Sequence, residues 1–367
     1  MPILEKSSAK RRSRLGDFLA VLLLVAVVAG LGWLAWHQKH PPKKSKGKTS
    51  AVVSTNVKAP ARPVEKPKPK PLVVAQQSPA EFPRAVRDVF EAQVALVRRA
   101  ISPGSIDAAI GSQTRAAIAA FQRSQKMFES STLDTNTRAQ LMLAAPLLTT
   151  YTVTTNDLAR LQPVGKTWLA KSEQSALDYE TVLELVAEKA HAHPLLVQKL
   201  NPNADWTNVA AGTVLKIPDV EYPEPADKAA LVVIHLSAKF LEAFDAESNL
   251  LLHCPCSIAA KVEKRPVGEL HVAAIAPDPN YTFDPAVFPE SPEAQAIGHK
   301  LILPPGPNNP VGVAWVSLDK PGYGIHGTPV PEQVGRTESH GCFRLANWDA
   351  EYFLKLAWVG LPVEVVP

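Results

Sequence analysis

A run of uncharged residues near the N-terminus constrains the architecture of this chain more than any other feature. Phe18 to Trp36 is nineteen residues long and carries no charged side chain. As a helix, at ~1.5 Å per residue, it would extend about 28 Å, close to the roughly 30 Å of a bilayer core. It is longer than a signal peptide's apolar region and lacks a clear cleavage site, which favours an uncleaved anchor over the alternative of a cleaved signal peptide. Residues 18–36 are therefore expected to span a membrane once, behind a basic cytoplasmic tail of residues 1–17.

Charge is divided unevenly along the chain. Residues 1–72 hold fifteen Lys and Arg against three Asp and Glu, so the remaining residues carry the net charge of −8 that brings the total to +4. The basic excess belongs to the tail and to residues 37–82, whose Pro, Lys, Ala and Val composition predicts an extended, solvated linker. No nucleic-acid-binding motif appears elsewhere, so we expect no nucleic-acid partner.

The residues that carry reactive chemistry are concentrated near the C-terminus. Cys342 lies in the run Ser339-His340-Gly341-Cys342-Phe343-Arg344, and the pair His326-Gly327 lies sixteen residues before it. A free thiol titrates near pH ~8.5 and becomes an effective nucleophile at neutral pH when an imidazole or a positive charge stabilises the thiolate. On chemistry alone, either histidine could be the base. A buried structural cysteine is the simpler alternative, but it explains less well why His, Gly, Cys and Arg fall within five residues.

The two motifs resemble those of the YkuD-type L,D-transpeptidases, which cross-link or modify bacterial peptidoglycan. The resemblance covers residues 229–367 and implies that Cys342 attacks the carbonyl between the L- and D-centres of a tetrapeptide stem. The stem is then held as a thioester, which an acceptor amine resolves. By the same resemblance, His326 is the general base and the Gly327 carbonyl orients its second nitrogen. His340 and Gly341 would shape the loop around the nucleophile.

The remaining site residues are also expectations. The backbone N–H groups of Gly341 and Cys342 would form an oxyanion hole. Arg344, Ser339 and Tyr323 would contact the substrate, Arg344 by offering its planar fork to a carboxylate. The resemblance implies no metal and no organic cofactor. An L,D-carboxypeptidase that trims stem peptides and an inactive wall-binding scaffold stay open as alternatives, because the sequence does not identify the acceptor.

A second group of cysteines invites a metal-site interpretation. His253-Cys254-Pro255-Cys256 has three donors within four residues, and His271 is a possible fourth. Structural zinc sites more often use a Cys-x2-Cys spacing, so two cysteines on one buried strand face are the simpler account. Cys254 and Cys256 lie too close together on a strand to form a disulfide readily.

Two segments between the linker and the catalytic region predict separate modules. Residues 83–148 resemble the three-helix peptidoglycan-binding domain, type 1, through the related runs Ile110-Gly111-Ser112-Gln113-Thr114-Arg115-Ala116 and Leu133-Asp134-Thr135-Asn136-Thr137-Arg138-Ala139. Residues 150–219 resemble a βααβ LysM module, with expected helices at Thr181–Ala190 and Pro194–Leu200. The segment differs from a typical LysM module by an insertion around Gly165–Asp178. For either segment, a helical or structural spacer is the alternative.

From residue 229 the pattern changes to short β-rich runs separated by turn residues, as in a sandwich or barrel. Asn347 could cap a helix that runs to Trp358, with Gly360 ending it. The expected fold is a multidomain α+β chain: a three-helix bundle, a LysM-like module and a mostly β catalytic domain behind a membrane helix and linker. We expect a monomer in the bacterial envelope, anchored in the cytoplasmic membrane, whose C-terminal body meets peptidoglycan outside the cell.

Overall fold

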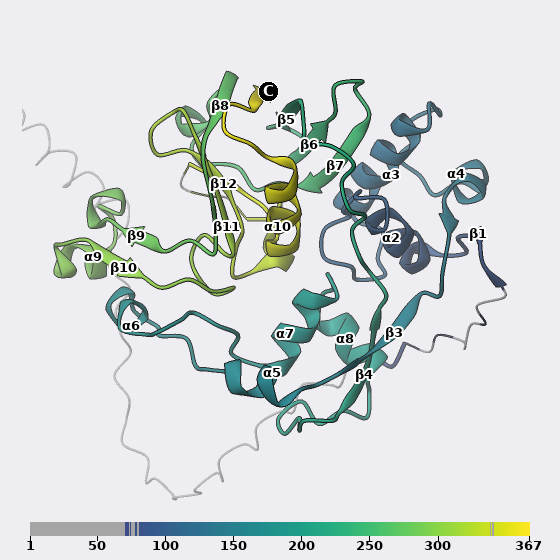
Figure 1. The fold of residues 1–367 in the computed structure, drawn as a ribbon, viewed down its shortest axis with the longest axis horizontal. Helices are drawn as coiled ribbons and strands as arrows, with labels where there is room; N and C mark the ends of the chain where they lie inside the picture. Colours follow the sequence, from purple (N-terminus) through teal and green to yellow (C-terminus); the bar gives the residue numbers. More distant parts are fainter. Residues whose placement is uncertain (1–69, 73, 75–77, 79–80, 338, 340) are drawn as a thin grey trace, which may run out of the picture. The chain divides into compact units, whose positions relative to one another are not determined.

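The computed structural model describes residues 70–72, 74, 78, 81–337, 339 and 341–367 (Figure 1). The predicted tail and anchor, and nearly all of the predicted linker, lie outside these residues. Within the described ranges, no helix is both long enough and apolar enough to span a bilayer. All the described residues belong to one structural unit.

The region predicted to be a three-helix bundle contains three helices around an apolar core. Asp88 caps the first by accepting a hydrogen bond from the Glu91 N–H, and Asp134 caps the third in the same way from the Thr137 N–H. Such caps satisfy backbone donors that a helix leaves free at its start. A two-residue strand pair, too short to leave a sequence pattern, joins the ends of the region. The elements are β1 (Arg84–Ala85), α2 (Val89–Val97), α3 (Ser112–Ser124), α4 (Thr135–Gln140) and β2 (Met142–Leu143).

Residues 148–218 begin and end with two strands that pair antiparallel, with four helices between them. The two helices predicted for this segment are present, and Thr181 and His193 cap them through their side chains. The predicted insertion contains one further short helix, α6. The elements are β3 (Leu148–Thr152), α5 (Thr155–Arg160), α6 (Trp168–Ser172), α7 (Val182–Lys189), α8 (Pro194–Leu200) and β4 (Val214–Pro218).

The C-terminal region is built on one curved sheet of eight strands in the order β13-β12-β11-β8-β14-β5-β6-β7. Ser257, just after the last strand of this order, forms a β-bridge with Arg344 in the first strand, so the two edges of the sheet meet. This is the mostly β half-barrel expected from the β-rich runs. Its strands are β5 (Leu231–His235), β6 (Phe240–Phe244), β7 (Leu250–Pro255), β8 (Gly268–Pro277), β11 (Ala314–Leu318), β12 (Gly324–His326), β13 (Phe343–Arg344) and β14 (Pro362–Val366).

One helix, α10 (Asn347–Leu356), packs against the sheet beside β11 (Figure 1). The prediction that Asn347 caps this helix was wrong: Ala346 is the N-cap residue, and the Asn347 side chain is used for contacts with other segments. The helix also ends at Leu356, two residues before the predicted end at Trp358. Its apolar face, including Phe353 and Leu356, lies in the core of the sheet.

A smaller two-stranded sheet projects from the half-barrel between β8 and β11. It consists of β9 (Tyr281–Phe283) and β10 (Leu301–Leu303), with the short helix α9 (Pro292–Ile297) between them. Figure 1 shows α6 beside β10 and α9. Trp168 of α6 stacks on Phe283 with ring centroids 4.5 Å apart, and Leu177 is fully buried in the same apolar cluster. The predicted insertion therefore packs on the C-terminal region.

Candidate active site

His326 is the last residue of β12, a strand bordered on one side by β11 and on the other by β13. Its side chain is buried, and the Trp315 ring stacks on it at a centroid distance of 5.6 Å. The ring nitrogen Nδ1 lies 2.6 Å from the Gly327 carbonyl oxygen, which can only accept a hydrogen bond. Nδ1 therefore carries the proton, and Nε2 is the nitrogen with a free lone pair.

Cys342 directly precedes β13 and is half-buried. Because β13 runs parallel to β12 with Phe343 beside Ile325, Cys342 comes next to Gly324, two residues from His326 along the neighbouring strand. Its thiol lies 3.6 Å from the Gly322 carbonyl oxygen. In the part of the chain that the structure describes, no hydrogen bond joins the thiol to the His326 ring.

Burial controls the protonation of this pair. It raises the pKa of the Cys342 thiol, an effect that the Gly324 backbone and the Arg344 charge partly offset. It lowers the pKa of His326 to about 4. Charged forms of both groups are disfavoured because the surroundings solvate them poorly. At neutral pH the resting pair is thus a thiol and a neutral imidazole, and the thiolate forms only when the proton moves.

Arg344 presents a guanidinium close enough to the thiol for the two groups to affect each other's pKa. Its side chain is half-buried, and its Nε atom is buried without a hydrogen-bond partner among the described residues. Burial lowers the pKa of Arg344, while Cys342 and Cys256 raise it. A buried donor without a partner is costly, so, within the part of the chain that the structure describes, the Nε position is open to an acceptor.

The other predicted site residues take different positions. Ser339 donates a hydrogen bond from Oγ to the Cys342 carbonyl oxygen at 2.6 Å and accepts one from the Gly341 N–H at 3.2 Å. Ser339 thus holds the turn before the nucleophile, and the Gly341 N–H is engaged there. Tyr323 is half-buried, with the Lys320 ammonium 5.3 Å from its ring centre. His340 lies outside the described residues.

The structure adds Tyr281, which the sequence analysis did not single out. Burial, and then the proximity of Cys342, raise the pKa of Tyr281 to about 12. The projecting sheet β9-β10 therefore carries an aromatic hydroxyl close enough to Cys342 for the two groups to interact electrostatically. Tyr281 is sixty-one residues away in sequence and belongs to no recognisable motif, so only the fold reveals it.

The cysteines considered as metal ligands are buried in the core of the half-barrel. Burial raises the pKa of Cys256 to about 12, and the pKa of Cys254 is raised further in the same direction. Across the described residues, no group of three His, Cys, Asp or Glu side chains is arranged to hold a metal ion. His253 contacts Glu242 at 3.0 Å instead.

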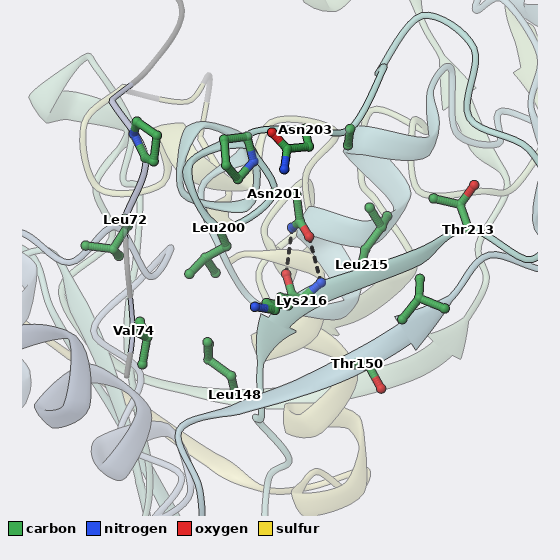
Figure 2. A pocket seen from close by; sticks show the side chains of 14 residues that line it. Leu72, Val74, Leu148, Thr150, Leu200, Asn201, Asn203, Thr213, Leu215 and Lys216 are labelled. Atoms are coloured by element: carbon green, nitrogen blue, oxygen red, sulfur yellow. Dashed lines mark hydrogen bonds between the residues drawn. The ribbon is translucent and has the colours of Figure 1, made fainter. Parts of the chain in front are cut away.

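A separate hollow lies over the strand pair β3-β4 (Figure 2). It has a volume of about 510 Å³. Asn201 fixes one side of it, since its side chain donates to the Lys216 carbonyl and accepts from the Lys216 N–H, both at 2.7 Å. Leu148, Leu200 and Leu215 supply apolar surface. Most of its lining comes from residues 148–216, and Pro71, Leu72 and Val74 complete it.

Two parts of the chain match known families. Residues 229–365 match the L,D-transpeptidase catalytic domain, YkuD, and residues 86–141 match the family described as "Putative peptidoglycan binding domain". These matches support an L,D-transpeptidase catalytic domain at residues 229–365 and a peptidoglycan-binding domain at residues 86–141. The two domains support peptidoglycan as a substrate, and the catalytic match points to the cell envelope.

Individual relatives are similar to this chain at low identity. "Putative L,D-transpeptidase YkuD" of Bacillus licheniformis is 24% identical over 188 residues, which are 51% of this chain and 94% of that protein. "Putative L,D-transpeptidase in ATP synthase subunits region ORF 5" of Fuscovulum blasticum is 28% identical over 136 residues, 37% of this chain and 69% of that protein. A solved L,D-transpeptidase from Mycobacterium smegmatis is 20% identical with a TM-score of 0.30, over 44% of this chain and 76% of that one.

Proposed function

We propose that this protein is a cysteine-dependent L,D-transpeptidase that forms an acyl-enzyme on Cys342. The observation that carries the proposal is the register of β12 against β13, which places Cys342 and His326 on neighbouring parallel strands. Nδ1 of the imidazole donates a hydrogen bond to the Gly327 carbonyl oxygen at 2.6 Å, so that Nε2 is available as a base. A thiol and an unprotonated imidazole on neighbouring segments are the parts that nucleophilic acyl transfer requires.

The proposed reaction has two acyl transfers. As Sγ of Cys342 attacks the donor carbonyl, Nε2 of His326 accepts the thiol proton. The carbon–nitrogen bond to the terminal D-residue breaks, the imidazolium returns the proton to the leaving amine, and a thioester remains. An acceptor amine then attacks the thioester, His326 takes a proton from that amine, and the thiol is restored as the new amide forms.

Neutral resting groups suit this sequence of steps. Because burial disfavours both the thiolate and the imidazolium, neither charge accumulates until substrate is present. Arg344, which lacks a partner at Nε among the described residues, is proposed to bind a carboxylate of the donor stem. Which backbone N–H groups stabilise the oxyanion stays a prediction; the Cys342 N–H is the stronger candidate, because the Gly341 N–H is already bonded to Ser339.

The remaining regions are proposed to hold the enzyme at its substrate. Residues 86–141 would bind the wall, and the hollow over β3-β4 is the place where a LysM-like module could hold a glycan strand. Its Asn201-Lys216 wall and apolar leucines offer the mixed surface that sugars prefer (Figure 2). A single membrane helix at residues 18–36 would tether the body outside the cytoplasmic membrane.

Muropeptide mass spectrometry tests the reaction. Walls from cells that overproduce the wild-type chain should gain L,D-cross-links or acceptor-modified stems, and cells that produce Cys342→Ala should not. A gain of shortened stems alone would indicate an L,D-carboxypeptidase. No change with a folded, wall-bound protein would favour an inactive scaffold.

The assignment of the base is tested on the purified protein. His326→Ala should abolish transpeptidation and slow alkylation of Cys342 by iodoacetamide at neutral pH, because the thiol loses its proton acceptor. His340→Ala should reduce turnover but alter the pH dependence of alkylation much less. The opposite pattern would exchange the two assigned roles.

A further inference from the structure

Glu188 lies in α7, outside the segment that matches the catalytic domain, yet its carboxyl group reaches the first residue of α10. The Nδ2 atom of Asn347 lies 3.1 Å from Oε1 and 3.2 Å from Oε2 of Glu188. The hydroxyl of Tyr179 donates a further hydrogen bond to Oε1 at 3.2 Å. In the part of the chain that the structure describes, this carboxyl group has no cationic partner.

Asn347 transmits this contact to the loop that follows His326. Its Oδ1 accepts a hydrogen bond from the Thr328 N–H at 2.9 Å, while Nδ2 also donates to the Pro307 carbonyl at 3.2 Å. The site is tightly packed, since a Cβ atom on either Gly327 or Gly312 would collide with Oδ1 of Asn347. Any reorientation of the amide would therefore move the Gly327–Thr328 turn.

The polarity of the partners determines which way the amide faces. Glu188 and the Pro307 carbonyl present acceptor oxygens, whereas the Thr328 N–H is a donor. All three can be satisfied only with Nδ2 toward Glu188 and Oδ1 toward Thr328. The same turn carries the Gly327 carbonyl that binds Nδ1 of His326. A continuous series of hydrogen bonds thus leads from α7 to the imidazole.

We propose that Glu188 is a positioning residue for His326, acting through Asn347 and the Gly327–Thr328 turn. The segment 148–218 is then a working part of the active site, whether or not it also binds glycan. The inference rests on the proposed function, because it concerns the base of that reaction. Burial without a cation disfavours the charged form of a carboxyl group, and the positioning of the catalytic base accounts for the presence of one at this place.

Steady-state kinetics on the full chain, measured as release of the terminal D-residue, test the proposal. Glu188→Ala should lower kcat by about 10- to 100-fold with little change in KM, because small displacements of a catalytic group reduce rate more than binding. Glu188→Gln keeps an acceptor oxygen toward Asn347 and should restore most of kcat. In an Asn347→Ala background, Glu188→Ala should reduce kcat no further.

A second measurement does not depend on activity. Hydrogen exchange at the Thr328 amide should be faster in Glu188→Ala and close to wild type in Glu188→Gln. Should Glu188→Ala fail to fold, the exchanged pair Asn347→Asp with Glu188→Gln replaces it: the double variant restores a donor opposite an acceptor and should be more active than Asn347→Asp alone.

Each result supports or overturns the inference. Unchanged kcat and unchanged Thr328 protection in Glu188→Ala would overturn it. So would equal losses of kcat in the wild-type and Asn347→Ala backgrounds, or a double variant no better than Asn347→Asp. A wild-type chain that releases no D-residue, but whose Thr328 protection depends on Glu188, would reject the proposed function and leave the structural link intact.

Discussion

Leu177 offers a direct test of how far the projecting sheet depends on the neighbouring segment. Leu177 comes from the end of the predicted insertion and is fully buried against Phe283 and Leu303. Its backbone is also held, since its N–H donates to the Pro305 carbonyl at 2.8 Å and its carbonyl accepts from the Asn308 N–H at 2.9 Å. Leu177→Ala keeps these backbone bonds and removes only the apolar side chain.

The expected cost follows from the atoms removed. Three carbon groups at ~0.8 kcal/mol each, together with the cavity left behind, give about 3 kcal/mol, within the roughly 2–5 kcal/mol found for buried Leu→Ala changes. If the substitution lowers the free energy of local opening of β9-β10 by this amount, the population of the open state rises about 100-fold, since ~1.4 kcal/mol corresponds to a tenfold change in an equilibrium constant.

Hydrogen exchange followed by mass spectrometry measures this opening. Peptides that contain β9 and β10 should exchange faster in Leu177→Ala, while β5, in the core of the half-barrel, should change much less. Leu169→Ala is the matched control, because Leu169 lies on the nearby helix α6 and is 47% exposed. Unchanged protection of β9-β10, or an equal loss in β5, would refute a local role for Leu177.

Three further predictions concern the thiol, the wall and a buried acid. A carbapenem should add once per chain to the wild type and not to Cys342→Ala, and an adduct mapped by intact-mass and peptide analysis to Cys254 would contradict the nucleophile. Cys342→Ser should still pellet with isolated sacculi, whereas loss of pelleting would show that the catalytic thiol contributes to wall binding. Burial raises the pKa of Glu188 to about 8 from 4.5, so its contribution to stability is complete below pH ~4.5 and is lost as pH rises to about 8. Chemical denaturation measures this effect: between pH ~4.5 and 8, the free energy of unfolding of the wild type should fall by at most about 5 kcal/mol relative to that of Glu188→Gln. If the two free energies change in parallel with pH, the pKa of Glu188 is not raised.

Local patterns in the sequence were sufficient for most of the strands and helices. The short β-rich runs expected after residue 229 include the strands β5, β6 and β7, since runs of four to eight mainly apolar residues between turns suit buried strands. α8 begins at Pro194 and ends at Leu200 as predicted, since Pro is well suited to the first turn of a helix. Helix ends were predicted most accurately where a nearby residue, such as Pro194, favours the end of a helix by its own backbone preference.

Local sequence patterns could not predict the contacts between distant segments. Asn is a residue type that often caps helices, but in this fold the Asn347 amide is bonded to Thr328, Pro307 and Glu188, which come from distant parts of the sequence. Tyr281 and the insertion around Trp168 also gain their roles from packing. The roles of His326 and Cys342 stay predictions from their chemistry and from the resemblance of their motifs, whereas their spacing of sixteen residues could not predict that they lie on neighbouring segments.

Because β12 and β13 pair parallel, the register of the two strands does not depend on the length of the chain that connects them, as it does in a hairpin. Parallel neighbours cannot be joined by a tight turn, so the chain between His326 and Cys342 has to cross from one end of the strand pair to the other. The position of Cys342 relative to His326 therefore follows from the register of the two strands and not from the length of the crossing. The crossing is itself anchored to the half-barrel, because Val334 is buried and the Gly335 N–H donates to Ser257 Oγ at 2.8 Å, so a change among residues 329–337 has to preserve those two contacts to leave the neighbouring strands undisturbed.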